Sequence, residues 1–204
     1  MQIENSAIMK NLQITSFYYI HGFASGKSST TFQKIKERIP QAKALTFDSS
    51  KSYQENIKSL ASQVANDKEP ACVIGTSLGG FYAMQLTPFV HYCAGRVLIN
   101  PSVKPKSSLR KFIGECPNFE TGSTFVFTEE VCNSYPEELD KRNLMCSIPT
   151  GVLLARDDEL LDYHLAEEVF DGYTGITYIS GGHRLKDFDA LFKEIKEVDY
   201  CALV

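Results

Sequence analysis

Three short runs of mostly apolar residues constrain the fold of this chain more than any other feature. They are ACVIG at 71–75, RVLI at 96–99 and GVLLA at 151–155. A strand with one face in water alternates apolar and polar side chains, whereas a strand that helices cover on both faces is apolar throughout. The runs therefore predict inner strands of a parallel sheet.

Strand and helix patterns alternate along the rest of the chain. This order predicts right-handed crossovers and a three-layer α/β fold, with a mostly parallel sheet of about six strands and helices on both faces. Further strands are predicted at 12–20, 43–47 and 176–180, and helices at 31–38, 52–66, 79–87, 163–170 and 188–198. Residues 1–11 are expected to form a loose N-terminal extension, and the weakly periodic residues 101–149 an insertion between two strands of the sheet.

Length and composition exclude several classes of protein. The 204 residues predict a single domain over 1–204. A net charge of −4 without a Lys/Arg run argues against a nucleic-acid partner. The chain lacks a leader pattern and an apolar run of about 18 residues, so we expect a cytoplasmic protein with no membrane span. The six cysteines form no CxxC pair, so no metal site or cofactor is predicted.

The strongest local motif is G-x-S-x-G at residues 75–79, GTSLG. It follows the apolar run at 71–75 and precedes a predicted helix, which is the setting of the nucleophile elbow in α/β-hydrolases. A side chain on either side of the serine would crowd this sharp turn, so Gly75 and Gly79 fit their positions. The motif predicts an α/β-hydrolase fold with Ser77 as the nucleophile, although a chance match in a Gly/Ser turn is the simpler alternative.

A serine nucleophile needs a base, and His183 is the best candidate among the four histidines. It lies in the loop GGHRL, after the predicted strand at 176–180, and the fold orders its catalytic residues Ser, Asp/Glu, His. His21 precedes Ser77, His91 follows it after one short helix, and His164 falls inside a predicted helix. The chain order therefore favours His183 as the base.

The acid that orients this base should follow the strand GVLLA. Asp158 lies 25 residues before His183, which leaves room for one helix and one strand between them. Asp157, Glu159 and Asp162 are competitors, and such a run of acids is often only a solvated loop. The D-x-apolar-apolar pattern that starts at Asp158 favours this residue over Asp157.

Acyl transfer also needs N–H groups directed at the developing oxyanion. The N–H of Leu78, next to the nucleophile, is one candidate, and the N–H of Phe23 in the early loop His21-Gly22-Phe23 is the other. Gly22 would allow a close approach of the backbone. We expect His21 to bind loop backbone rather than transfer protons.

The same loop offers a competing interpretation as a phosphate-binding P-loop. Gly22 is followed by only three residues before Gly26-Lys27-Ser28, whereas the P-loop motif needs four. The phosphate cradle depends on this length, because successive N–H groups must point inward. A nucleotide-binding function would also leave Ser77 and His183 unexplained.

These motifs together resemble the YqiA-like small bacterial esterases, a branch of the α/β-hydrolases. The matching segments are YYIHGFASG at 18–26, GTSLGGFYA at 75–83, VLINPSVKP at 97–105, DELLDY at 158–163 and GGHRLKDF at 181–188. The resemblance implies a Ser77, Asp158, His183 triad and hydrolysis of carboxylic esters or thioesters, with acyl-CoA as one candidate substrate. It supports Asp158 over Asp157 and is weakest at 106–150.

The insertion at 101–149 leaves the predicted sheet after one strand and returns at the next. Ligands of open α/β sheets bind outside the carboxyl ends of the strands, so the insertion should cover the nucleophile as a short lid. Its apolar residues either complete the core or line an acyl pocket. They are Leu109, Phe112, Ile113, Phe119, Phe125, Val126, Phe127 and Leu144.

The sequence therefore predicts a serine hydrolase that acts on a small-molecule ester or thioester. The alternative from another class is a non-catalytic binding protein for small molecules on the same fold. Neither the natural substrate nor the oligomeric state can be derived from the sequence.

Overall fold

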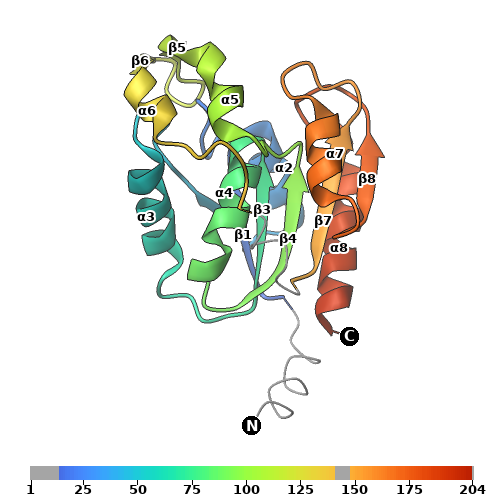
Figure 1. Cartoon of the computed structure of the whole chain (residues 1–204). Helices are drawn as coiled ribbons and strands as arrows, with labels where there is room; N and C mark the ends of the chain where they lie inside the picture. Colours follow the sequence, from blue (N-terminus) through green and yellow to red (C-terminus); the bar gives the residue numbers. More distant parts are fainter. Residues whose placement is uncertain (1–13, 141–147, 204) are drawn as a thin grey trace.

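Six parallel strands form the central sheet of the computed structural model, which describes residues 14–140 and 148–203 (Figure 1). Every neighbouring pair of strands in this sheet is parallel. The strands, in spatial order, are β2 (Lys43–Leu45), β1 (Ser16–Ile20), β3 (Ala71–Thr76), β4 (Cys93–Ile99), β7 (Thr150–Ala155) and β8 (Ile176–Ile179). The predicted fold class is therefore confirmed, and each of the expected strands of the sheet is present.

Helices cover both faces of this sheet. Alternate residues of β1 point to opposite sides, so Tyr18 packs in one apolar cluster with Phe81, whereas Tyr19 packs in the other with Ile35. The first cluster is covered by α3 (Tyr53–Val64), α4 (Leu78–Leu86) and α7 (Tyr163–Phe170). The second is covered by α2 (Thr30–Arg38) and α8 (Phe188–Leu203).

Local signals explain where these helices begin. Ser29 caps α2 by accepting the N–H of Phe32, and Ser52 forms a capping box with Glu55 at the start of α3. Helix α4 differs, because it is buried on nearly all sides and follows Ser77 without any side-chain cap. The position of Ser77 is therefore fixed by the packing of α4 rather than by capping. Leu86 passes directly into a short 3₁₀ turn, Thr87–Phe89.

The insertion lies above the carboxyl ends of the strands (Figure 1). It contains a β-hairpin that the weak periodicity did not predict, because each of its strands has only 4 residues. Leu109 and Phe127 are buried and complete the core, whereas Phe119 and Val126 are exposed. The elements are α5 (Pro105–Leu109), a 3₁₀ turn (Arg110–Phe112), β5 (Gly114–Pro117), β6 (Thr124–Phe127) and α6 (Glu129–Asn133).

Two expectations from the sequence concern residues outside the described ranges, namely the extension at 1–11 and the apolar side chain of Leu144. Within the described ranges, no helix is long and apolar enough to cross a membrane.

Candidate active site

Ser77 occupies a strained turn between β3 and α4. Its backbone angles are φ 56° and ψ −120°, a region that residues other than glycine rarely adopt. A Cβ on Gly75 would lie 2.2 Å from the carbonyl oxygen of Gly79, and one on Gly79 would lie 2.1 Å from that of Ile20. Only glycine fits at both positions, and the G-x-S-x-G spacing therefore reflects packing of α4 against β1 and β3.

Asp158 and His183 form a close pair at the carboxyl ends of the strands, the end of the sheet at which Ser77 also lies. The carboxylate oxygens of Asp158 lie 2.8 and 3.0 Å from Nδ1 of His183. The two side chains are 2% and 12% exposed, so the pair is largely shielded from water. Nδ1 is thereby occupied, and Nε2 of His183 has no hydrogen-bond partner among the described residues.

Backbone groups hold the Asp158 carboxylate in place. The N–H groups of Leu160 and Leu161 both donate to Oδ1, at 2.8 and 2.9 Å. The neighbouring Asp157 does not contact the imidazole, because its carboxylate accepts the N–H of Gly181. The adjacent Asp157 and Asp158 thus bind different groups, although they are hard to distinguish in the sequence.

A turn after β4 links the serine to the histidine. Ser77 N–H donates to the carbonyl of Ile99 at 2.9 Å, and Ser102 N–H donates to the carbonyl of Ser77 at 3.0 Å. Between them, the Asn100 amide donates to the carbonyl of His183 at 3.1 Å. The hydroxyl of Ser77 makes no hydrogen bond to a described residue, so Ser77 and His183 are connected through this turn rather than directly.

Asn100 is the residue of this site that sequence reasoning missed. It is buried and adopts φ 43°, which asparagine tolerates better than most residues. Its side-chain oxygen accepts the N–H of Ala155 at 2.7 Å, while its amide holds His183. The only local signal was the Asn-Pro pair after a strand, which predicts a turn but not this bridge.

The segments that carry the two candidate oxyanion donors, the N–H groups of Leu78 and Phe23, lie close to Ser77. Leu78 is the first residue of α4, where N–H groups have no partner inside the helix. A Cβ on Gly22, next to Phe23, would lie only 3.4 Å from Cβ of Ser77. Among the described residues, no acceptor is bound to the N–H of Phe23.

The ring of Phe23 connects this loop to the insertion. It stacks on Phe112 at a centroid distance of 5.1 Å and meets Phe127 edge-on at 5.0 Å. Phe125 is a third neighbour, at 5.8 Å. The insertion therefore supports the loop that carries a candidate oxyanion donor.

His21 is buried, and both of its ring nitrogens bind backbone. Nδ1 donates to the carbonyl of Gly22 at 2.8 Å, and Nε2 accepts the N–H of Phe47 at 3.4 Å. Burial lowers the pKa of His21 below its ordinary value, so the ring is neutral. This is the backbone-binding role that the sequence predicts for this residue. His164, by contrast, lies exposed on α7.

Two donors of the early loop that a phosphate could use are already bound to a carboxylate. Both the N–H and the hydroxyl of Ser28 donate to Glu120 of the insertion, at 2.8 and 2.5 Å. A Cβ on Gly26 would lie 2.5 Å from the same carboxylate oxygen. This arrangement counts against a P-loop function for the segment.

Two further features concern ligands. A hollow of about 490 Å³ lies at the opposite end of the sheet, at the amino ends of β4, β7 and β8, and is remote from Ser77. Within residues 14–140 and 148–203, no group of three or more His, Cys, Asp or Glu side chains is arranged to hold a metal ion.

Comparison with solved structures supports the class that the sheet and the serine turn define, which is the α/β-hydrolase fold. One solved chain, described under the metagenome-derived lipolytic enzymes LipS and LipT, matches at a TM-score of 0.68 and 13% identity, over 94% of this chain and 95% of that chain. Est1E from Butyrivibrio proteoclasticus matches at 0.63 and 11%, over 92% and 86%. The alpha/beta hydrolase domain-containing protein 10 from mouse matches at 0.62 and 16%, over 90% and 88%.

A family model described as an uncharacterised protein family, UPF0227, matches residues 16–199. The chain belongs to this family, which is the YqiA-like family that its motifs resemble.

Proposed function

We propose that this protein is a serine hydrolase that cleaves carboxylic esters or thioesters through an acyl-enzyme on Ser77. The observation that carries the proposal is the shielded Asp158–His183 pair, with Nε2 of the imidazole free, at the edge of the sheet where Ser77 occupies its strained turn. Esterases and lipolytic enzymes among the structural neighbours support the same class of reaction.

In the proposed reaction, Nε2 of His183 takes the proton of Ser77 as the hydroxyl oxygen attacks the substrate carbonyl. The N–H groups of Leu78 and Phe23 donate to the oxyanion of the tetrahedral intermediate. His183 then protonates the leaving alcohol or thiol, and water hydrolyses the acyl-enzyme by the same sequence of steps. Asp158 keeps Nδ1 protonated and stabilises the imidazolium.

The absence of a direct Ser77–His183 hydrogen bond agrees with this mechanism. Catalytic hydrogen bonds are often long without substrate and shorten when the substrate binds. The bridge through Asn100 keeps the histidine loop attached to the turn that also holds Ser77.

The test combines a serine probe with an ester series. A fluorophosphonate should label Ser77 in the folded protein, and p-nitrophenyl esters of increasing chain length, measured beside acyl-CoAs, should identify the preferred substrate. Ser77→Ala should abolish labelling and reduce turnover by roughly 10⁴-fold or more, because the nucleophile is lost. Unchanged turnover in Ser77→Ala, or no labelling of the folded wild-type protein, would refute the proposal.

The acid is tested by a matched pair of variants. Asp158→Asn should reduce kcat by about 10³-fold or more, because the amide favours the wrong tautomer of His183. Asp157→Asn should stay within about tenfold of the wild type, because Asp157 binds loop backbone at Gly181 and does not contact the imidazole. The reverse order of effects would assign the acid to Asp157.

A further inference from the structure

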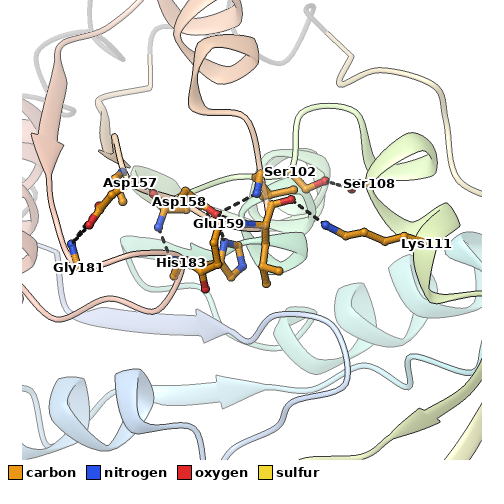
Figure 2. Close-up of polar contacts among 12 residues, drawn as sticks. Ser102, Ser108, Lys111, Asp157, Asp158, Glu159, Gly181 and His183 are labelled. Atoms are coloured by element: carbon orange, nitrogen blue, oxygen red, sulfur yellow. Dashed lines mark hydrogen bonds and ion pairs between the residues drawn. The ribbon is translucent and has the colours of Figure 1, made fainter.

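Three consecutive carboxylates face the loop that carries His183 (Figure 2). Only Asp158 contacts the imidazole. Both carboxylate oxygens of Asp157 lie 3.0 Å from the N–H of Gly181, and Oε2 of Glu159 accepts the N–H of His183 at 2.8 Å. The flanking acids therefore bind the backbone of the loop whose side chain the central acid binds.

The loop has little ability to hold this conformation by itself. Gly181 and Gly182 have φ values of 114° and 81°, and two successive glycines lose more conformational entropy on ordering than any other pair. A Cβ on Gly182 would lie 2.7 Å from Oε2 of Glu159, so this carboxylate packs directly against the glycine. External contacts must therefore fix the loop.

Those contacts bind His183 at its ring Nδ1, its N–H and its carbonyl oxygen, and leave Nε2 free. Asp158 binds the ring, Glu159 binds the N–H, and Asn100 donates to the carbonyl oxygen at 3.1 Å. Asp157 fixes the residue two positions earlier. Hydrogen bonds from the backbone hold the pKa of Asp157 and Glu159 below their ordinary values, so both are ionised and accept strongly at neutral pH.

We propose that Asp157 and Glu159 are positioning residues that fix the backbone of the His183 loop, so that the imidazole meets both Asp158 and the substrate. This inference rests on the proposed function, in which His183 is the base. Neither residue touches the reacting atoms. Each acts by holding the loop in the one conformation in which Nε2 is directed to the reaction.

The experiment compares alanine with the isosteric amide at each position. Asp157→Ala and Glu159→Ala remove the acceptor, whereas Asp157→Asn and Glu159→Gln keep an oxygen in its place. Glu168→Ala is the matched control, because Glu168 is exposed on α7 and makes no hydrogen bond through its side chain. Each variant is measured for kcat and KM on one p-nitrophenyl ester and for amide hydrogen exchange at Gly181 and His183.

The expected result is a fall in kcat of roughly tenfold in each alanine variant, with KM changed by less than about twofold, since one exposed charge-assisted hydrogen bond is lost. The amides should exchange faster, and the Asn and Gln variants should recover most of kcat. Equal losses in the alanine and amide variants, or wild-type kcat and exchange in the alanine variants, would overturn the inference.

The exchange measurement separates this inference from the proposed function. If the wild-type protein hydrolyses neither esters nor thioesters, the proposed function fails. Faster exchange at Gly181 and His183 in Glu159→Ala would then still support the role of Glu159 in holding the loop. Unchanged exchange would overturn that role independently of any activity.

Discussion

His183 and His21 show how burial gives two histidines different chemistry. His183 binds a carboxylate through Nδ1 and leaves Nε2 available, whereas His21 uses both nitrogens on backbone groups. His21 is 1% exposed and its ring stacks on Phe47 at a centroid distance of 4.4 Å, so a positive charge there would lose its hydration. His21 therefore supports the loop that carries Phe23 and has no free nitrogen for proton transfer.

This burial makes stability depend on pH. Because the folded protein lowers the pKa of His21, the unfolded chain binds more protons once the pH falls below about 6.5. The free energy of unfolding should therefore decline as the pH falls from 7.5 to 5. In His21→Gln, which cannot titrate, urea unfolding should show a smaller decline. The exposed His91 provides the control, because His91→Gln should keep the wild-type slope.

Helix α4 sets the position of the nucleophile through close packing. The helix lies against β1 and β3, and the carbonyl oxygen of Ile20 occupies the space where a Cβ of residue 79 would lie. A substitution at this point must move the helix or the strand, because a backbone atom cannot rotate away. Close packing of α4 thus links the fold to the placement of Ser77.

Gly79→Ala should destabilise the fold by roughly 2 kcal/mol or more, through overpacking against backbone. The measurement is urea unfolding, with Gly175→Ala as the matched control. A Cβ on Gly175 meets nothing within 4 Å, and its backbone is not in the left-handed region, so this variant should unfold like the wild type. Equal stability of Gly79→Ala and Gly175→Ala would contradict this account of the elbow.

Across the whole molecule, the insertion is attached to both halves of the sheet. On one side, Glu120 binds Ser28 in the loop after β1. On the other, Lys111 donates to the carbonyl of Leu160, just after the acid, at 2.8 Å (Figure 2). The insertion thus connects the candidate oxyanion loop to the loop that holds Asp158.

Loosening one attachment should change how substrate binds. Glu120→Ala should raise KM for long-chain esters by a few-fold, because the hairpin beside Phe23 loses a charge-assisted hydrogen bond. The free energy of unfolding should change by about 1 kcal/mol at most, since this contact is exposed. Glu115→Ala, on the same hairpin, is the control. Identical kinetics of both variants would argue against a role of the attachment in binding.

The sequence by itself determined the sheet, the serine turn and the chain order of the candidate residues. These follow from local properties, since apolar runs predict buried strands, and the sharp turn around Ser77 needs glycine at positions 75 and 79. The short strand β2 was predicted as well, at 43–47, and spans Lys43–Leu45 in the structure.

The sequence favoured Asp158 among the adjacent acids, but only the tertiary structure shows that its carboxylate contacts His183. The structure also revealed the bridge through Asn100 and the hairpin of the insertion. The contacts of Asp158 and Asn100 with His183 join residues 25 and 83 positions apart in the chain, whereas the strands of the hairpin are too short to show a periodicity. Local periodicity does not show which residues far apart in the chain come into contact, because this depends on how the strands pair side by side in the sheet.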